Sequence, residues 1–175
     1  MVITKICNNI STAVRRMRVR RMQRKRTHGN GNTFSWGNLA PHTFSLGVCG
    51  NNNTVTFGAG VRAQQLRIVI RGSDNTLHVA GGCSLVSCTI EFWGKRCHIY
   101  LGERTGVVGG YFAVAESDTG IEVGSDCLFA DGVEIRTGDG HAIYDVTTKL
   151  RVNPSKSVFI GDRVWLASRV RVNKG

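Results

Sequence analysis

A repeat of 22 residues constrains the fold of this 175-residue chain more than any other feature. Gly50, Gly72 and Gly94 stand 22 residues apart, and pairs of apolar residues keep the same interval. These pairs are Val55 and Phe57, Leu77 and Val79, Ile99 and Leu101, and Ile121 and Val123. A fainter copy at Phe34 and Trp36 places the start of the array near Gly29. Units of this kind bury their apolar face only against neighbouring copies, which predicts a solenoid.

A second, shorter spacing indicates what each unit is made of. Apolar residues recur every six residues at Val123, Phe129 and Ile135, and apolar and polar residues alternate around them. Alternation of this kind is typical of strands with one buried face. Three short strands in each coil, stacked coil upon coil, predict an all-β parallel β-helix. Each coil is about four residues longer than three hexapeptides, and we assign the surplus to the polar turns 50–53 and 72–75, whose Gly, Asn and Asp residues tolerate positive φ.

The repeat also predicts where several side chains point. One inward column should contain Val61, Cys83, Thr105 and Cys127. Because coils lie ~4.8 Å apart, cysteines two coils apart are beyond the reach of a disulfide bond. We therefore expect the six cysteines of the chain to be buried, reduced thiols, whereas His78 should point outward. No secretory signal and no apolar run of transmembrane length is visible.

The repeat is interrupted between Thr137 and Val158, where residues 138–157 contain Asp139, His141, Tyr144 and Asp145 without a hexapeptide pattern. A loop that leaves a rigid solenoid is where function is usually carried. This segment is therefore our candidate for the functional loop.

Positive charge is concentrated at the amino-terminal end. Residues 1–73 contain twelve Lys and Arg and no acidic residue, whereas the rest of the chain is close to neutral. Ile3, Ile6, Ile10, Val14 and Met17 fall at helical spacing among arginines, which predicts a basic amphipathic helix within residues 1–28. Docking on a membrane surface and a solvated or solenoid-capping helix are both open for this segment. Nucleic acid is an unlikely partner, because residues 1–33 contain no aromatic side chain.

The loop and its flanks, residues 121–145 and the stretch N-P-S-K-S-V-F-I-G-D-R-V-W-L-A-S at 153–168, resemble the hexapeptide-repeat O-acetyltransferases. The similarity is greatest to enzymes that modify capsule and O-antigen sugars, and extends to galactoside and maltose acetyltransferases. It covers residues 29–175 and implies a left-handed β-helix, a homotrimer, acetyl-CoA as cosubstrate and a cytoplasmic location. Family members continue for further coils, so the domain is expected to be incomplete at its carboxyl end.

The resemblance also implies roles for individual residues. His141 matches the catalytic histidine, which would act as general base, and Asp118 matches an acidic residue that contacts the acceptor sugar. Glu116, Asp139 and Tyr144 are further candidates for binding the acceptor, and Trp165 and Ala167 for binding acetyl-CoA. Asp139 or Glu134 could fix the tautomer of the histidine. Gly110 stands where the galactoside enzymes have an asparagine, and Ala167 replaces a family glycine.

The function that follows is direct, acetyl-CoA-dependent acetylation of a sugar hydroxyl during synthesis of a surface polysaccharide. The alternative is a non-catalytic solenoid, a fragment or inactive relative, that binds a membrane surface at the inner face or a partner through residues 1–28. A zinc enzyme is a weaker interpretation, because no second histidine near His141 completes a metal-ligand set. We therefore predict no metal.

Overall fold

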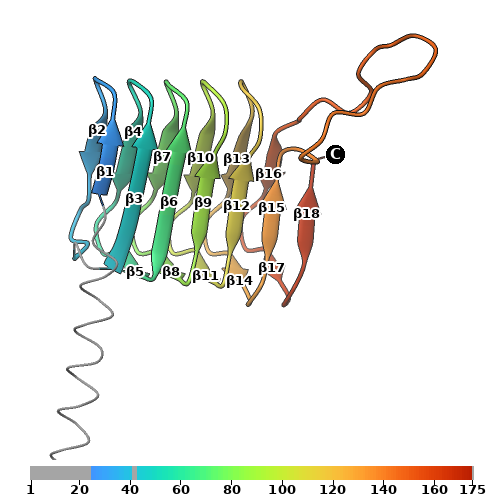
Figure 1. Ribbon diagram of the computed structural model, residues 1–175. Helices are drawn as coiled ribbons and strands as arrows, with labels where there is room; N and C mark the ends of the chain where they lie inside the picture. Colours follow the sequence, from blue (N-terminus) through green and yellow to red (C-terminus); the bar gives the residue numbers. More distant parts are fainter. Residues whose placement is uncertain (1–24, 41–42, 175) are drawn as a thin grey trace, which may run out of the picture.

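The computed structural model describes residues 25–40 and 43–174, which form a solenoid of eighteen short strands (Figure 1). Every pairing between named strands is parallel, and the strands build three sheets that we name A, B and C. The all-β parallel solenoid predicted from the repeat is therefore confirmed. The helix expected in the amino-terminal segment lies outside the described residues.

The three sheets form the sides of the solenoid. Each complete coil contributes one strand to each sheet, whereas the first coil has no strand in sheet C among its described residues and the final partial coil contributes a strand to sheet A only. Sheet A contains, in spatial order, β1 (Lys25–His28), β3 (Phe44–Cys49), β6 (Leu66–Arg71), β9 (Thr89–Phe92), β12 (Tyr111–Val114), β15 (Glu134–Arg136) and β18 (Arg171–Asn173). Sheet B contains β2 (Thr33–Ser35), β4 (Thr54–Phe57), β7 (Thr76–Val79), β10 (His98–Leu101), β13 (Gly120–Val123) and β16 (Val158–Ile160). Sheet C contains β5 (Arg62–Gln64), β8 (Ser84–Val86), β11 (Gly106–Val108), β14 (Leu128–Phe129) and β17 (Trp165–Leu166).

The winding is left-handed, as the resemblance implied. In Figure 1 the strands of sheet A run upward on the near side, the chain passes over the top to the far side, and successive coils advance to the right. The register follows the sequence repeat, because Val55 pairs with Leu77 and Leu77 pairs with Ile99. The period of 22 residues is thus the length of one coil.

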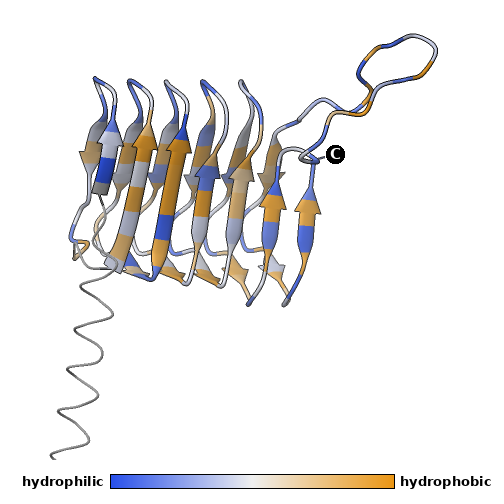
Figure 2. Cartoon of the chain, in the orientation of Figure 1, coloured by the Kyte–Doolittle hydropathy of each residue, from blue (hydrophilic) through white to orange (hydrophobic). Residues whose placement is uncertain are grey.

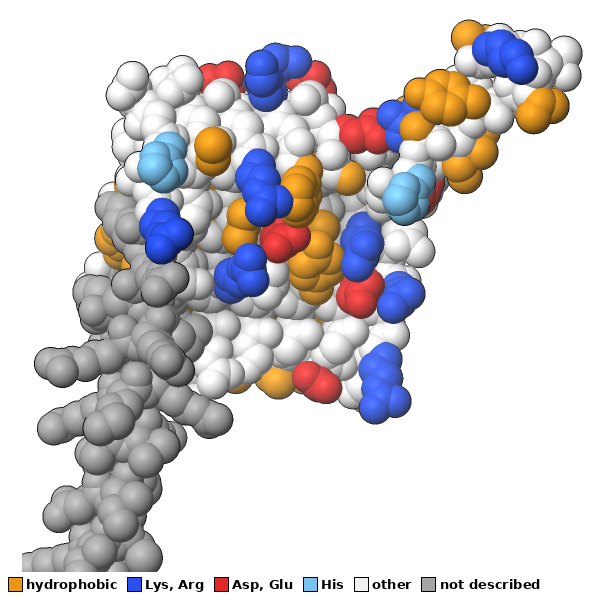
Figure 3. All heavy atoms as spheres, viewed as in Figure 1, with side chains coloured by type: hydrophobic (Ala, Val, Ile, Leu, Met, Phe, Trp, Pro, Cys, Tyr) orange, Lys and Arg blue, Asp and Glu red, His pale blue; other side chains and the backbone are white. Residues whose placement is uncertain are grey.

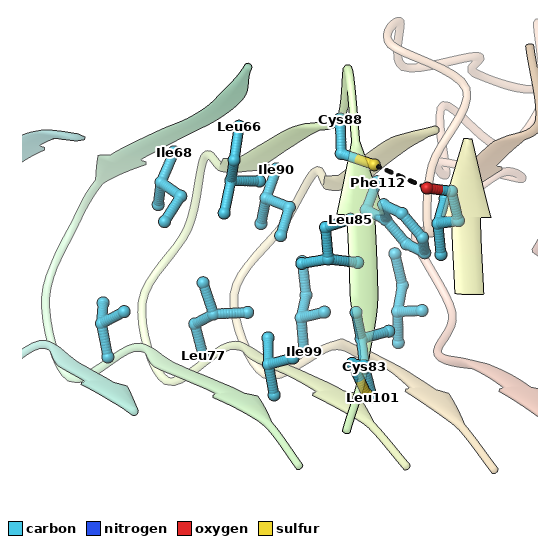
Figure 4. Packing of buried hydrophobic residues seen from close by; sticks show 14 of the residues in the cluster. Leu66, Ile68, Leu77, Cys83, Leu85, Cys88, Ile90, Ile99, Leu101 and Phe112 are labelled. Atoms are coloured by element: carbon cyan, nitrogen blue, oxygen red, sulfur yellow. Dashed lines mark hydrogen bonds between the residues drawn. The ribbon is translucent and has the colours of Figure 1, made fainter. Parts of the chain in front are cut away.

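The interior is filled by stacked apolar columns. Figure 4 shows Ile68 and Ile90 in a row on one sheet, facing Leu77 and Ile99 on another. Residues of the expected column, Val61, Cys83, Thr105 and Cys127, are all buried. Each fully buried Leu, Ile or Phe contributes roughly 1.5–3 kcal/mol relative to an exposed position. Figure 2 shows how hydrophobic and hydrophilic residues alternate along the strands that enclose this core.

The cysteines follow the expectation with one exception. Cys83, Cys88, Cys97 and Cys127 are free and buried, and His78 is exposed on sheet B as predicted. Cys49 is also free, but it is exposed, so the prediction that all the cysteines are buried was wrong. The reason is its place as the last residue of β3, where the alternation of the strand turns its side chain outward. Cys7 lies outside the described residues.

The polar turns join sheet A to sheet B, at the corner where the surplus residues were expected. Residues 50–53 connect β3 to β4, residues 72–75 connect β6 to β7, and Asn52 and Asp74 have φ of 54° and 60°. Asn75 is fully buried, donates from Nδ2 to the carbonyl of Gly94 (3.0 Å) and accepts from the Cys97 amide (2.9 Å). Its side chain therefore satisfies backbone groups that the turn leaves without strand partners.

The solenoid begins earlier than the sequence suggested. β1, at Lys25–His28, pairs with β3, so these residues belong to the first coil and not to a separate segment ending at residue 28. Their basic character is compatible with a strand because Arg26 and His28 are exposed on the outer face of sheet A. Within the part of the chain that is described, no helix has the length and apolarity needed to cross a membrane.

Candidate functional site

The looped-out segment, residues 138–157, leaves the solenoid at the corner between sheets A and B, where the polar turns also lie. It joins β15 to β16, and Ile121 pairs with Val158 across 37 residues, 15 more than the 22 of an ordinary coil. The insertion projects away from the solenoid (Figure 1), and an antiparallel bridge between Tyr144 and Arg151 closes it into a narrow arm. Its base therefore lies next to the corner of the preceding coil, which contains Glu116.

A pocket of about 410 Å³ lies on the outer face of sheet A, against the base of this loop. Its floor consists of small residues at outward positions, Ala113 and Ala115 on the coil of β12 and Gly138 on the next coil. Its walls are Trp93, Tyr111, Glu116, Arg136, Gly140, His141, Ala142 and Arg151. Figure 3 shows this face, where hydrophobic side chains lie among arginines beside the projecting loop. A concave site with an apolar floor and converging polar groups is typical of a ligand-binding pocket.

The wall on the solenoid side is held by contacts between neighbouring coils. The Arg136 guanidinium lies 4.9 Å from the centroid of the Tyr111 ring, and its Nη2 is 3.3 Å from a carboxylate oxygen of Glu134. The Tyr111 hydroxyl donates to Glu91 (2.8 Å), and burial together with this carboxylate raises the pKa of the tyrosine. Tyr111 therefore stays a neutral donor over the physiological range and fixes one side of the pocket.

The loop is attached to the solenoid through Glu116. One carboxylate oxygen of Glu116 accepts from Arg151 and the other from the backbone amide of Ser155 (3.3 Å). The hydrogen bond from Arg151 keeps the pKa of Glu116 below its ordinary value. Both partners belong to the returning half of the loop, so Glu116 holds that half against the corner of the preceding coil.

Asn153 organises the base of the loop around His141. It is 8% exposed, and its Nδ2 donates to the backbone carbonyl of His141 (2.8 Å) and to the Asp139 carboxylate (2.9 Å). Its Oδ1 accepts from the backbone amide of Ile143 (2.6 Å). These bonds join both halves of the loop and fix the backbone on either side of the histidine.

The imidazole of His141 lies at the rim of the pocket and is exposed. Asp139 instead accepts from Asn153 and pairs with Lys174 (3.1 Å), and these contacts lower its pKa. Glu134 is engaged by Arg136 and Arg171, each at 3.3 Å. Among the described residues neither carboxylate bonds the ring, which leaves the exposed imidazole without a carboxylate partner. The proposed fixing of the tautomer by Asp139 or Glu134 has no contact to support it.

Two curated proteins that match this chain share one description. No family model matches the chain. A polysialic acid O-acetyltransferase of Neisseria meningitidis is 33% identical over 132 residues, which are 74% of this chain and 60% of the relative. One from Escherichia coli O1:K1 / APEC is 35% identical over 81 residues, 46% of this chain and 26% of the relative. The chain thus spans about three fifths of the first relative and about a quarter of the second.

Two solved structures have the same fold. The polySia-specific acetyltransferase NeuO matches with a TM-score of 0.77 and 28% identity over 86% of this chain and 68% of that chain. The polysialic acid O-acetyltransferase OatWY matches with a TM-score of 0.73 and 30% identity over 85% of this chain and 70% of that chain. The chain belongs to the hexapeptide-repeat O-acetyltransferases. The resemblance seen in the sequence is confirmed at the level of the family.

The pocket of this member of the hexapeptide-repeat O-acetyltransferase family brings together only some of the residues that the resemblance suggested. His141 and Glu116 line it, and Asp139 lies at the base of the loop. Asp118 does not line it and forms an ion pair with Arg96 (2.6 Å) at the corner. Tyr144 is 60% exposed, away from the pocket on the projecting arm.

The residues expected to bind acetyl-CoA lie on another side of the solenoid. Trp165 is in β17 of sheet C with 73% of its surface exposed, and the exposed Ala167 follows that strand. Gly110 is buried and faces the core, where an added Cβ would lie 2.4 Å from Cγ1 of Val107. A side chain there could not reach the pocket, so the family asparagine has no counterpart at Gly110.

Several pocket residues were not found from the sequence. Trp93, Tyr111 and Arg136 come from three successive coils and meet only because the coils stack. The register that joins them was visible in the repeat, and projecting it onto the outward positions would have found the first two. Arg151 was missed because no periodicity relates a loop residue to Glu116. Among the described residues no group of three or more His, Cys, Asp or Glu side chains could hold a metal ion.

Proposed function

We propose that this chain transfers an acetyl group from acetyl-CoA to a sugar hydroxyl of an acidic capsular polysaccharide, with polysialic acid as the favoured acceptor. The observation that carries the proposal is His141, held by its backbone at the rim of a pocket with its ring free, in a chain whose relatives are polysialic acid O-acetyltransferases. Acetyl-CoA is available in the cytoplasm, and we place the reaction there.

The chemistry requires a base at the acceptor hydroxyl. In the proposed reaction a ring nitrogen of His141 removes the hydroxyl proton while the oxygen attacks the thioester carbonyl, the bond to sulfur breaks, and the same proton passes to the departing thiolate. Histidine suits this role because its ordinary pKa lies near neutrality. The acceptor ring would lie on the Ala113 and Ala115 floor beside Trp93.

We propose further that the complete site is shared between copies of the chain in a homotrimer. His141 lies at the pocket on sheet A, whereas Trp165 and Ala167 are on sheet C of the same chain. These residues can surround one acetyl group only if the second set comes from a neighbouring copy. The strongly exposed Trp165 is compatible with a position at such a boundary.

The proposal is tested by incubating the purified chain with acetyl-CoA and polysialic acid. Release of the CoA thiol should depend on the acceptor, and NMR of the product should show an O-acetyl ester on the sugar. Hydrolysis of acetyl-CoA without ester formation, or no turnover with any acidic or neutral glycan tested, would support the non-catalytic alternative.

Sharing of the site is tested separately by mixing two inactive variants. His141→Ala and Trp165→Ala proteins are unfolded together and refolded, so that copies mix within an assembly. A site with its histidine from one copy and its tryptophan from another would regain activity in the mixture. A mixture as inactive as its components would contradict the shared site.

A further inference from the structure

The outer face of sheet A carries a second feature, on the amino-terminal side of the pocket. Outward residues of neighbouring strands are aligned by the register, so that His28, Cys49 and Arg71 form a row across β1, β3 and β6. Arg71 is followed on the next coil by Trp93, and its guanidinium lies 4.3 Å from the centroid of the Trp93 ring. This row therefore leads directly to a wall residue of the pocket.

The charges along this part of the face are unbalanced. Arg26, Arg67 and Arg71 are exposed, and none of them has an acidic partner among the described residues. Among the outward residues of the sheet A strands β1, β3, β6 and β9, the acidic side chain is Glu91, and it accepts a hydrogen bond from the Tyr111 hydroxyl. By contrast, the acids at the corners and in the loop, such as Asp118, Asp126 and Glu116, are each paired with an arginine. Exposed arginines without acidic partners on one face favour the binding of an anionic ligand.

We propose that Arg71 and Arg67, together with the exposed ring of Trp93, form an accessory subsite for carboxylate-bearing sugar residues that flank the residue being acetylated. The inference rests on the proposed function, because it takes the pocket as the place of the reacting sugar. The polysaccharide then runs from the pocket across β9 and β6 toward β1, along the axis of the solenoid. Arg71 and Arg67 both bind carboxylates of the flanking residues, and Trp93 packs against the apolar face of a sugar ring.

The geometry explains why these residues would act as a unit. Arg71 and Arg67 are at the two ends of the outward row of β6, on one coil, and Trp93 is on the coil between them and the floor of the pocket. Neighbouring coils are ~4.8 Å apart, so this subsite begins within about two coils of the floor. Stacking on Trp93 also holds the Arg71 guanidinium flat, which leaves its edge N–H groups free for a carboxylate.

The subsite predicts a dependence on both the length and the charge of the acceptor. A long acidic polymer reaches Arg71 and Arg67, whereas a short oligomer that fills the pocket does not. The test measures the binding of size-fractionated polysialic acid, and of the same polymer with its carboxylates reduced to alcohols, to the full chain and to Arg67→Gln, Arg71→Gln and the double variant. Arg62→Gln is the matched control, because Arg62 is an exposed arginine close in sequence that lies on β5 of sheet C, away from this face.

We expect each of the two substitutions to raise the Kd for long polysialic acid about 2- to 5-fold, the range of an exposed ion pair, and the double variant to raise it more. Added salt should reduce the difference between variants. The carboxyl-reduced polymer and the shortest fractions should bind all variants alike, and Arg62→Gln should bind like the unsubstituted chain. Circular dichroism would verify that the variants are folded.

Equal losses of affinity in Arg62→Gln and Arg71→Gln would overturn the subsite, since they would show a general effect of net charge. Unchanged binding in the double variant would overturn it as well, as would equal loss with single-stranded DNA as the probe, which would indicate a nonspecific polyanion surface. Because binding is measured without acetyl-CoA, arginine-dependent binding in a chain that transfers no acetyl group would refute the proposed reaction and leave the subsite standing.

Discussion

Substitution of Asn153 should disturb the position of His141 without lowering the stability of the solenoid. Replacing Asn153 by Ala removes the bonds to the His141 carbonyl, the Asp139 carboxylate and the Ile143 amide. At about 1 kcal/mol for each hydrogen bond, the ordering of the loop is weakened by about 3 kcal/mol, or roughly 100-fold in its opening equilibrium. The stacked columns of the core are untouched, because all three bonds lie within the loop.

Hydrogen exchange and kinetics measure the two consequences of Asn153→Ala. The amides of Ile143 and Val152, which are bonded within the loop, should exchange roughly 100-fold faster at most, while the amides of β9 and β12 keep their rates. Acetyl transfer should fall by about 10- to 100-fold, because a displaced base loses alignment with its substrate. Asn153→Asp should behave similarly, since its carboxylate cannot donate to the His141 carbonyl and faces Asp139.

Asn173→Ala is the matched control, because Asn173 is exposed on β18 of the same face. It should change neither loop exchange nor turnover. Wild-type turnover in Asn153→Ala would refute the view that Asn153 positions the histidine. Faster exchange throughout sheet A in that variant would show that Asn153 supports the whole solenoid instead.

Three further predictions follow from the contacts in the solenoid and at the loop. Asn75→Ala leaves the buried Gly94 carbonyl and Cys97 amide without partners and should lower the free energy of unfolding by about 2 to 6 kcal/mol in urea denaturation; a loss under 1 kcal/mol would argue against this role. The pKa of Glu116 is depressed in the folded chain, so its carboxylate stabilises the attached loop at pH values above the ordinary pKa of a glutamate. This stabilisation is lost as the pH falls through the depressed pKa, and Glu116→Gln should abolish the resulting pH dependence of loop hydrogen exchange. In a Cys7→Ser background, Ellman's reagent should modify the exposed Cys49 in the native chain and the four buried thiols only after unfolding. In the native chain burial also raises the pKa of Cys88 to about 11, and rapid reaction of more than one thiol before unfolding would contradict the packing.

More of the fold than of the candidate site could be predicted from the sequence. The spacing of 22 residues predicts both the coils and the corner turns, because every coil must bury one face of its strands against the neighbouring coils. Leu77 and Ile99, which are 22 residues apart, are paired in the structure as this spacing predicts. Residues 25–28 were misassigned because a charged strand at the end of a solenoid has no apolar pattern to reveal it. Cys49 was misassigned because position in a strand, and not residue type, decides which way a side chain points.

The site depended on contacts that no local pattern records. The resemblance identified His141, and the structure placed it beside a pocket, but Arg151 and Asn153 reach their partners only through the path of the loop. The repeat predicts that Trp93 points outward, but it does not predict that Trp93 lines a pocket. That pocket exists because the residues beside Trp93 on the following coils are small. Long-range loop contacts and surface shape are therefore the parts that the sequence did not predict.

The central claim is that His141 is the base of an acetyl transfer, and one kinetic comparison tests it most directly. The turnover number for acetyl-CoA and polysialic acid is measured for the unsubstituted chain, for His141→Ala and for His78→Ala, in which an exposed histidine of sheet B is removed. The account predicts a fall of roughly 10²- to 10⁴-fold in His141→Ala, with unchanged affinity for acetyl-CoA and an unchanged melting temperature, and no change in His78→Ala. Undiminished turnover in folded His141→Ala would contradict it.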